Sequence, residues 1–194
     1  KHLFSDFAGI LYAILASIGF IYCVTWAIRR WFPTCPAPAY FMTIAIILNT
    51  SGLAWCVRRS LVYEIALLSA CAFAVCGLAL NMSSISSGNV RHGRLFFGCL
   101  LMALAVGCRP TAAFISLLNI PLAMIAFFPD GVYRNFFGTL WKNKRTILLC
   151  VVPYLIVAGL LMGYNFLRFG NPFEFGRTYQ FSYIDANIYN NGLT

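Results

Sequence analysis

Charged residues are scarce in this chain of 194 residues: only 10% are Asp, Glu, Lys or Arg, and just five are acidic. A soluble globular domain carries about 25% charged and about 45–50% apolar residues, whereas 61% of this chain is apolar. This imbalance excludes an ordinary soluble enzyme and a disordered chain. The few charges also gather between long uncharged runs, which is typical of an α-helical protein that crosses a membrane several times.

Common catalytic and metal-binding signatures are missing as well. The chain has no Walker loop, no G-x-S-x-G motif and no Asp-x-Asp or Asp-Glu pair, and its only histidines are His2 and His92. The eight cysteines form no C-x-x-C pair, and most lie inside apolar runs, where cysteine usually acts as a small buried side chain. The sequence therefore identifies no cofactor and no metal-binding residues, and a divalent cation at a carboxylate is left as an open alternative.

Six apolar segments reach or approach the length of about 20 residues that a helix needs to cross a hydrocarbon core about 30 Å thick. Arginine pairs or polar turns separate them. The sequence therefore predicts an all-α, polytopic transmembrane helical bundle that forms a single module over residues 1–194. The six predicted membrane helices cover residues 7–28, 39–57, 61–80, 95–108, 111–128 and 147–167.

The distribution of Lys and Arg predicts the orientation, because basic loops stay on the cytoplasmic side. Eight basic residues follow the first, third and fifth segments, and six lie on the other face. Both ends of the chain are then outside, and the net charge of +9 reflects membrane topology rather than nucleic-acid binding. Because the chain starts at Lys1 with no signal peptide, we expect a fragment of a longer membrane protein with an upstream span.

The predicted outer face carries arginines where the second, fourth and sixth segments end: Arg58, Arg59, Arg109 and Arg168. A guanidinium binds phosphate oxygens in a bidentate way, so these arginines could bind the phosphate of a lipid-linked substrate. Glu64, near the start of the third segment, could face the same cavity as a base, a cation ligand or a salt-bridge partner. The alternatives are arginines that snorkel to lipid headgroups and a glutamate that compensates the helix dipole.

Arg109 follows the shortest segment, residues 95–108, which forms only about 21 Å of helix. Unless residues 90–94 extend this helix, Arg109 lies below the outer interface, where a charge needs a water-filled cavity or a partner. Pro110 ends this helix and suits the first position of the next one. A simple tight turn between two helices is the alternative.

Two further patterns concern packing and the C-terminal region. Small residues recur at four-residue spacing in the third segment, which allows a neighbouring helix to approach closely. Residues 168–194 are aromatic and polar and contain the turn formers Gly170 and Pro172. We expect an outer-face aromatic loop that could roof a substrate cavity, with an interfacial aromatic belt as the alternative. In the third segment, Ala66, Ala70 and Ala74 have the four-residue spacing, and Gly77 lies near the same helix face.

Three stretches together resemble a known group of proteins: RSLVYE at residues 59–64, GCLLMALAVGCRPT at 98–111 and YNFLRFGNPFEFGRTYQF at 164–181. They are similar to bacterial membrane proteins related to the dolichyl-phosphate-mannose–protein mannosyltransferase family, among the GT-C glycosyltransferases. The resemblance covers roughly residues 55–182 and is most specific in the third stretch. It implies an enzyme of the bacterial inner membrane that transfers a sugar from a polyprenyl-phosphate carrier, on the periplasmic or extracellular side.

By the pattern of that family, Glu64 matches the acidic position of a helix that faces the active-site cavity, and Arg109 matches a nearby Arg/His-Pro-Thr turn. The principal catalytic aspartate of the family has no counterpart in this chain, so the catalytic loop would be missing. The alternative is a polytopic transporter or lipid-handling protein without transferase activity. Unbroken first, third and sixth segments, with charges at their ends, favour an outer-face site over a path through the membrane.

Overall fold

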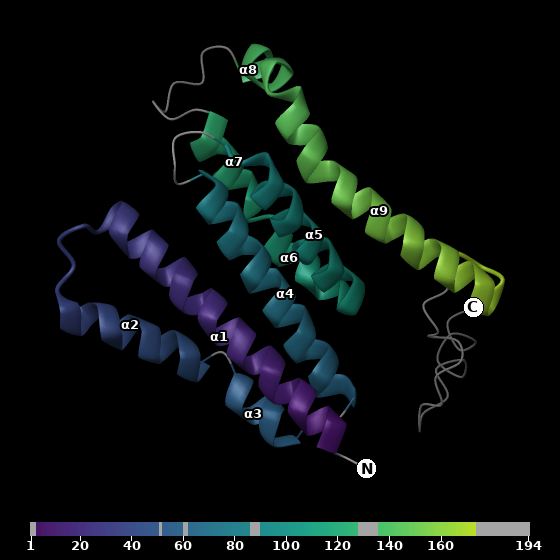
Figure 1. Ribbon diagram of the computed structural model, residues 1–194, viewed down its shortest axis with the longest axis horizontal. Coiled ribbons are helices and arrows are strands. Elements are labelled where there is room, and N and C mark those ends of the chain that lie inside the picture. The colour runs from purple at the N-terminus through teal and green to yellow at the C-terminus, as the bar shows by residue number, and fades with distance from the viewer. Residues whose placement is uncertain (1–2, 51, 60–61, 86–89, 128–135, 174–194) are drawn as a thin grey trace, which may run out of the picture. The chain divides into compact units, whose positions relative to one another are not determined.

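A computed structural model of the chain describes residues 3–50, 52–59, 62–85, 90–127 and 136–173. Every regular element in these ranges is a helix (Figure 1). The chain divides into unit 1, residues 1–157, and unit 2, residues 158–194, and the last helix runs from one into the other. The helices are α1 (Leu3–Trp31), α2 (Ala37–Thr50), α3 (Leu53–Arg59), α4 (Val62–Ile85), α5 (His92–Cys108), the 3₁₀ turn η1 (Pro110–Ala112), α6 (Ala113–Ser116), α7 (Asn119–Phe127), α8 (Phe136–Lys142) and α9 (Lys144–Phe169).

Three helices are long and apolar enough to cross a membrane, as judged by length and composition: Asp6–Trp31 in α1, Glu64–Ile85 in α4, and α9. The apolar stretch of α4 is 56% buried, against 22% for α1 and 17% for α9. Large side chains of α1 such as Phe7 and Ile18 therefore stay exposed. An apolar surface of this extent indicates contact with lipid or with another protein.

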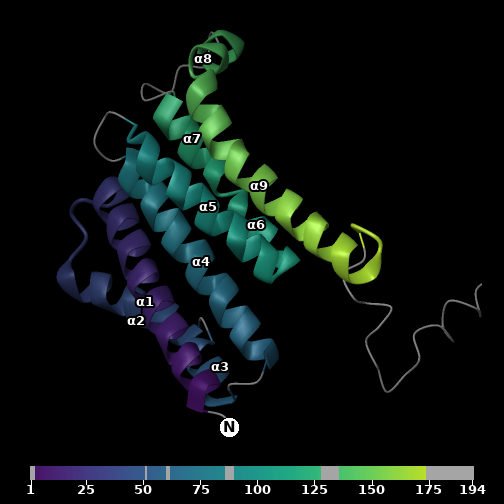
Figure 2. The same ribbon diagram turned by 45° about the vertical axis from the view of Figure 1, so that its right-hand side comes forward.

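Helix α4 lies at the centre of unit 1, between α1 and α5 (Figures 1 and 2). Glycines permit both close approaches. A Cβ atom at Gly19 of α1 would lie 2.8 Å from Cγ1 of Val75, and one at Gly77 of α4 would lie 2.6 Å from the carbonyl oxygen of Gly98 in α5. Real Cβ atoms do not come this close, so a larger residue would push the helices apart.

The predicted small-residue face of α4 does pack against a neighbouring helix. Ala70 and Ala74 are buried in a cluster with Ala105 of α5 and Ala112 of η1. Small side chains let the helix backbones come close, and the dispersion contacts then stabilise the pair. The four-residue spacing therefore marks a face of α4 that a neighbouring helix approaches closely, as predicted.

Two of the six predicted segments are broken. The second becomes α2 and α3, which are separated near Gly52, whose φ of 68° is accessible mainly to glycine. The fifth becomes η1, α6 and α7, with Leu117 and Leu118 in turns between α6 and α7. Pro121 gives a physical reason for the second break, because it has no N–H to donate to the carbonyl of Leu117 and suits only the first turn of a helix.

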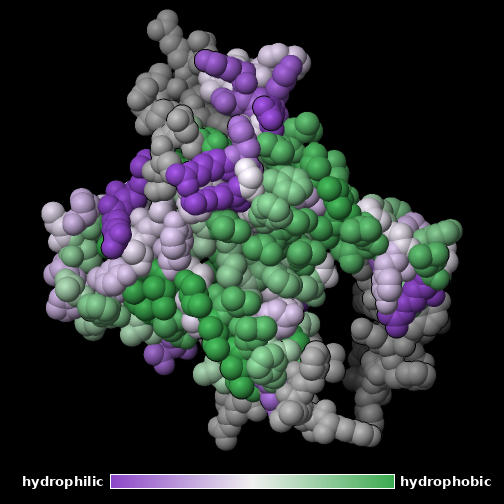
Figure 3. All heavy atoms as spheres, in the orientation of Figure 1, coloured by the Kyte–Doolittle hydropathy of each residue, from purple (hydrophilic) through white to green (hydrophobic). Residues whose placement is uncertain are grey.

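One end of unit 1 collects basic residues, and we call it the basic end. Figures 1 and 2 place the C-terminal end of α1, the N-terminal end of α5 and the start of α9 there. Hydrophilic atoms gather along this end in Figure 3, beside a hydrophobic surface. The first turn of α4 and the end of α5 lie at the opposite end, which we call the Glu64 end. The described basic residues of this end are Arg29, Arg30, Arg91, Arg94, Lys142, Lys144 and Arg145.

Candidate functional site

Glu64 stands in the first turn of α4, at the Glu64 end of unit 1. The N-terminus of a helix attracts negative charge, because its first N–H groups have no partner within the helix. One carboxylate oxygen, Oε2, is buried and has no hydrogen-bond partner among the residues that the structure describes. A buried acceptor without a partner is costly, so this oxygen is a natural site for a proton, a hydroxyl group or a cation from a ligand.

Arg109 joins α5 to η1 in an extended conformation, with φ −149° and ψ 120°. Its N–H donates to the carbonyl oxygen of Ala105 at 2.9 Å, and its own carbonyl accepts from the N–H of Ala112 at 2.9 Å. Pro110 opens η1 at the first position, as the Arg-Pro-Thr sequence predicts. Helix α5 begins at His92, so residues 92–94 extend the predicted fourth segment to 17 residues, or about 26 Å, which is still short of a bilayer core.

Glu64 and Arg109 lie in one region of unit 1, where both charges act on the Cys56 thiol of α3. Helix α3 packs against α4, and η1 packs against both α4 and α5. A carboxylate and a guanidinium in one region can together accept a proton and stabilise a phosphate, so this is the candidate site.

The structure does not place the side chains of the other predicted arginines in this region. Arg58 and Arg59 are the last two residues of α3, and their side chains lie outside the described part of the chain. Arg168 belongs to unit 2, where it is exposed; its Nη1 donates to the hydroxyl of Tyr164 at 3.3 Å, and its guanidinium lies 5.0 Å from the centre of the Phe169 ring. Most of the predicted aromatic loop, from residue 174 onward, lies outside the described residues.

A buried polar cluster in unit 1 was not among the predicted site residues. Asn81 of α4 is 1% exposed, and its Nδ2 donates to Oδ1 of Asn119 in α7 at 2.9 Å. Asn119 in turn donates from Nδ2 to the Tyr154 hydroxyl of α9 at 3.3 Å and to Sδ of Met102 at 3.2 Å. This cluster connects four helices through side chains in an otherwise apolar interior.

The cluster borders a small cavity of about 30 Å³, enough room for one water molecule. Asn81 Oδ1 is buried without a hydrogen-bond partner in the described part of the chain. Asn119 and Tyr154 lie inside the predicted fifth and sixth apolar segments, and polar side chains within such segments are a recognised functional signal. That signal could have identified the two residues from the sequence, although not their mutual hydrogen bond or the bond from Asn81 to Asn119.

No group of three or more His, Cys, Asp or Glu side chains that could hold a metal ion occurs among the residues that the structure describes. Comparison of the chain with protein families, with curated proteins and with solved structures gives no match.

Proposed function

We propose that this chain is the membrane-embedded part of a GT-C-type glycosyltransferase that uses a polyprenyl-phosphate-linked sugar donor. The reaction would take place at the Glu64 end of the bundle. The observation that carries the proposal is the buried carboxylate oxygen Oε2 of Glu64, which has no described hydrogen-bond partner and lies in the same region of unit 1 as the Arg109 guanidinium. The resemblance of residues 55–182 to the mannosyltransferase-related proteins supplies the reaction class.

In the proposed mechanism, an acceptor hydroxyl attacks the anomeric carbon of the donor sugar. The new bond joins the acceptor oxygen to the anomeric carbon, and the bond from that carbon to the phosphate oxygen breaks. The polyprenyl phosphate leaves with the electron pair, and Arg109 stabilises its charge through paired hydrogen bonds. A carboxylate takes the proton of the acceptor. The principal base would come from a segment outside these residues, with Glu64 orienting the acceptor or binding a divalent cation.

The proposed membrane orientation places the basic end in the cytoplasm and the Glu64 end outside, in a bacterial inner membrane. Basic residues at the cytoplasmic ends of spans are the usual arrangement. The 17 residues of α5 cover only about 26 Å of the 30 Å core. If the basic end sits at one interface, Arg109 lies slightly below the other, where a phosphate partner would stabilise its charge.

An activity assay with the full-length protein tests the proposal. We expect Arg109→Lys to insert and fold but to lose at least about tenfold in sugar transfer from a polyprenyl phosphate, because lysine keeps the charge but not the bidentate fork. Glu64→Gln should also lower turnover. Arg94→Lys, an equivalent change at the basic end, is the matched control and should stay within about twofold of the parent. Turnover equal to that of the parent in all three variants would exclude catalysis at the Glu64 end.

A lipid-handling or transport function is the second candidate, and the two broken helices favour it. Transporters often place discontinuous helices around a buried polar site, and the breaks near Gly52 and Leu118 resemble this arrangement. The cluster around Asn81 and Asn119 would then be the polar site. Reconstituted protein that moves a polyprenyl phosphate or another solute across vesicles, without sugar transfer, would support this candidate over the transferase.

A further inference from the structure

A surface pocket of about 420 Å³ lies on α1 at the basic end of unit 1. Its members recur three or four residues apart, so they share one face of the helix. Arg29 and Arg30 are exposed there. The Trp26 ring packs edge-on against Trp31, with the ring centres 5.9 Å apart. The described lining residues are Tyr22, Thr25, Trp26, Arg29 and Arg30.

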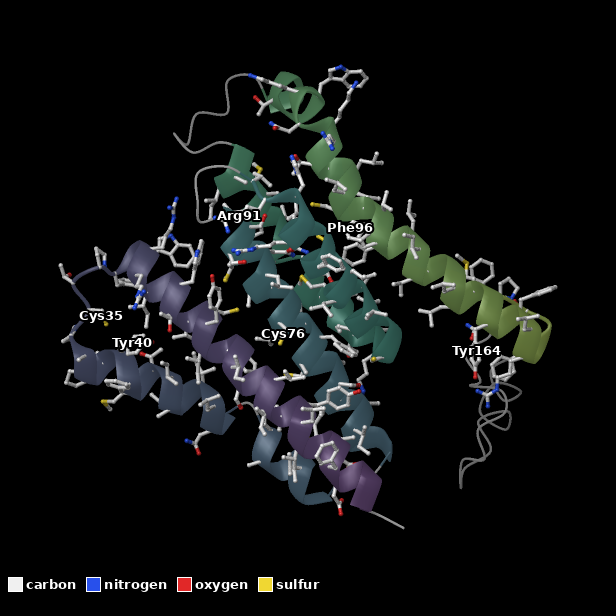
Figure 4. The ribbon with its side chains drawn as sticks, in the orientation of Figure 1. Cys35, Tyr40, Cys76, Arg91, Phe96 and Tyr164 are labelled. Atoms are coloured by element: carbon white, nitrogen blue, oxygen red, sulfur yellow. The ribbon has the colours of Figure 1, made fainter. Side chains whose placement is uncertain are left out.

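The two guanidinium groups are the charged hydrogen-bond donors among the described lining residues of this pocket. The Thr25 hydroxyl already donates to the carbonyl oxygen of Ile21 at 2.6 Å, so it accepts from the Tyr40 hydroxyl of α2, 2.5 Å away. Figure 4 shows Tyr40 between α2 and α1. The described acids, Asp6 and Glu64, lie in the first turns of α1 and α4, at the opposite end. No described carboxylate is therefore placed to neutralise the arginine pair.

An exposed apolar strip leads along α1 into the pocket. Ile14, Ile18 and Tyr22 are 52%, 59% and 41% exposed and recur every four residues, on the face that carries Trp26 and Arg29. The sixteen residues from Ile14 to Arg29 span about 24 Å of helix. That length exceeds the depth of about 15 Å of one leaflet of a bilayer core, so an acyl chain can follow the strip for its whole length.

We infer that this pocket binds the phosphate of an anionic phospholipid such as phosphatidylglycerol, with one acyl chain along Ile14, Ile18 and Tyr22. Guanidinium groups bind phosphate oxygens in pairs, and aromatic side chains favour the headgroup level. The apolar strip selects a lipid over free phosphate. The inference rests on the membrane placement of α1 in the proposed function, but not on sugar transfer, because the pocket and Glu64 lie at opposite ends of unit 1.

The first test uses the unmodified chain, purified in detergent, with phosphatidylglycerol and phosphatidylcholine of identical acyl chains in competition. Native mass spectrometry should show phosphatidylglycerol retained at least about tenfold better, because phosphatidylcholine carries a quaternary ammonium that repels the arginine pair. Soluble glycerol phosphate and inorganic phosphate, at the same concentration, should not displace the lipid. Equal retention of the two lipids, or displacement by either soluble phosphate, would overturn the inference.

The second test locates the site. Arg29→Gln with Arg30→Gln should weaken phosphatidylglycerol binding at least about tenfold, since each charge-assisted hydrogen bond contributes about that factor. Arg91→Gln with Arg94→Gln removes the same charge from the same end and should change binding less than about threefold. A lipid-free unfolding temperature equal to that of the parent identifies folded variants. Equal losses in both pairs would overturn the pocket, and would leave sugar transfer at the Glu64 end untouched.

Discussion

Asn81 of α4 and Asn119 of α7, 38 residues apart, are joined by a hydrogen bond of 2.9 Å between Nδ2 and Oδ1. Both amides also lie against the Met102 sulfur of α5, at 3.5 Å and 3.2 Å. A buried amide is costly unless it is paired, so this contact specifies how α4, α5 and α7 are rotated against one another. The apolar contacts around it stabilise the bundle without the same directionality.

The Asn81–Asn119 pair should show measurable coupling in a double-mutant cycle. We expect Asn81→Ala and Asn119→Ala to be non-additive by about 0.6 kcal/mol and by at most about 1.7 kcal/mol, the average and the maximum for side-chain hydrogen bonds between membrane helices. Reversible unfolding of the purified chain in mixed micelles measures this energy. Asn143 lies in the turn between α8 and α9, and its Nδ2 donates to the carbonyl of Thr139 in α8. It supplies the control pair with Asn81, because no described bond joins these two side chains. Additive losses for Asn81 and Asn119 would contradict the pairing.

Gly98→Ala should destabilise the packing of α4 on α5. Its Cβ atom would clash with Oδ1 of Asn81 and lie 2.8 Å from the carbonyl oxygen of Gly77, and overpacking of this kind costs about 1–3 kcal/mol. Gly93→Ala is the control on the same helix, because nothing lies within 4 Å of its Cβ position. The unfolding temperature should therefore be lower for Gly98→Ala and close to that of the parent for Gly93→Ala. A Gly98→Ala protein as stable as the parent would refute the close helix contact.

Gly170 ends α9 with a φ of 70°, and its N–H donates to the carbonyl oxygen of Phe166 at 2.8 Å. Alanine in this left-handed conformation costs about 1–2 kcal/mol, whereas asparagine tolerates it better. We expect hydrogen exchange in the last turn of α9 to be faster in Gly170→Ala and to be largely restored in Gly170→Asn. Unchanged hydrogen exchange in the alanine variant would mean that the left-handed conformation of Gly170 does not stabilise the last turn of α9.

The predicted topology can be tested by thiol labelling of intact cells. A cysteine introduced by Asn171→Cys should react with an impermeant reagent from outside. Cys35, between α1 and α2 at the basic end, and a cysteine introduced by Lys142→Cys should react only after permeabilisation. The other native cysteines are replaced by serine in all samples. Labelling of Cys35 but not of position 171 from outside would invert the orientation and place the Glu64 end in the cytoplasm.

Much of the secondary structure follows from local patterns in the chain. Long apolar runs predict α1, α4 and α9 with ends within a few residues of those observed, because helix length and hydropathy are properties of one continuous segment. Pro110 and Gly170 predict the turns at the ends of α5 and α9, since each restricts or frees the backbone at its own position. The small-residue spacing of α4 likewise predicts a close helix contact.

Other features depend on which helices become neighbours, and hydropathy contains no information about that choice. Hydropathy predicts one membrane span where Gly52 divides α2 from α3. A single glycine with a left-handed backbone hardly changes the mean hydropathy of an apolar segment. Asn81 appears in the sequence only as the start of a polar stretch, and its pairing with Asn119 depends on how two distant helices are rotated. The placement of Glu64 and Arg109 in one region of unit 1 requires α3, α4 and η1 to pack together. Such contacts depend on the relative position of separate helices, which is a property of the packed bundle and not of any segment within it.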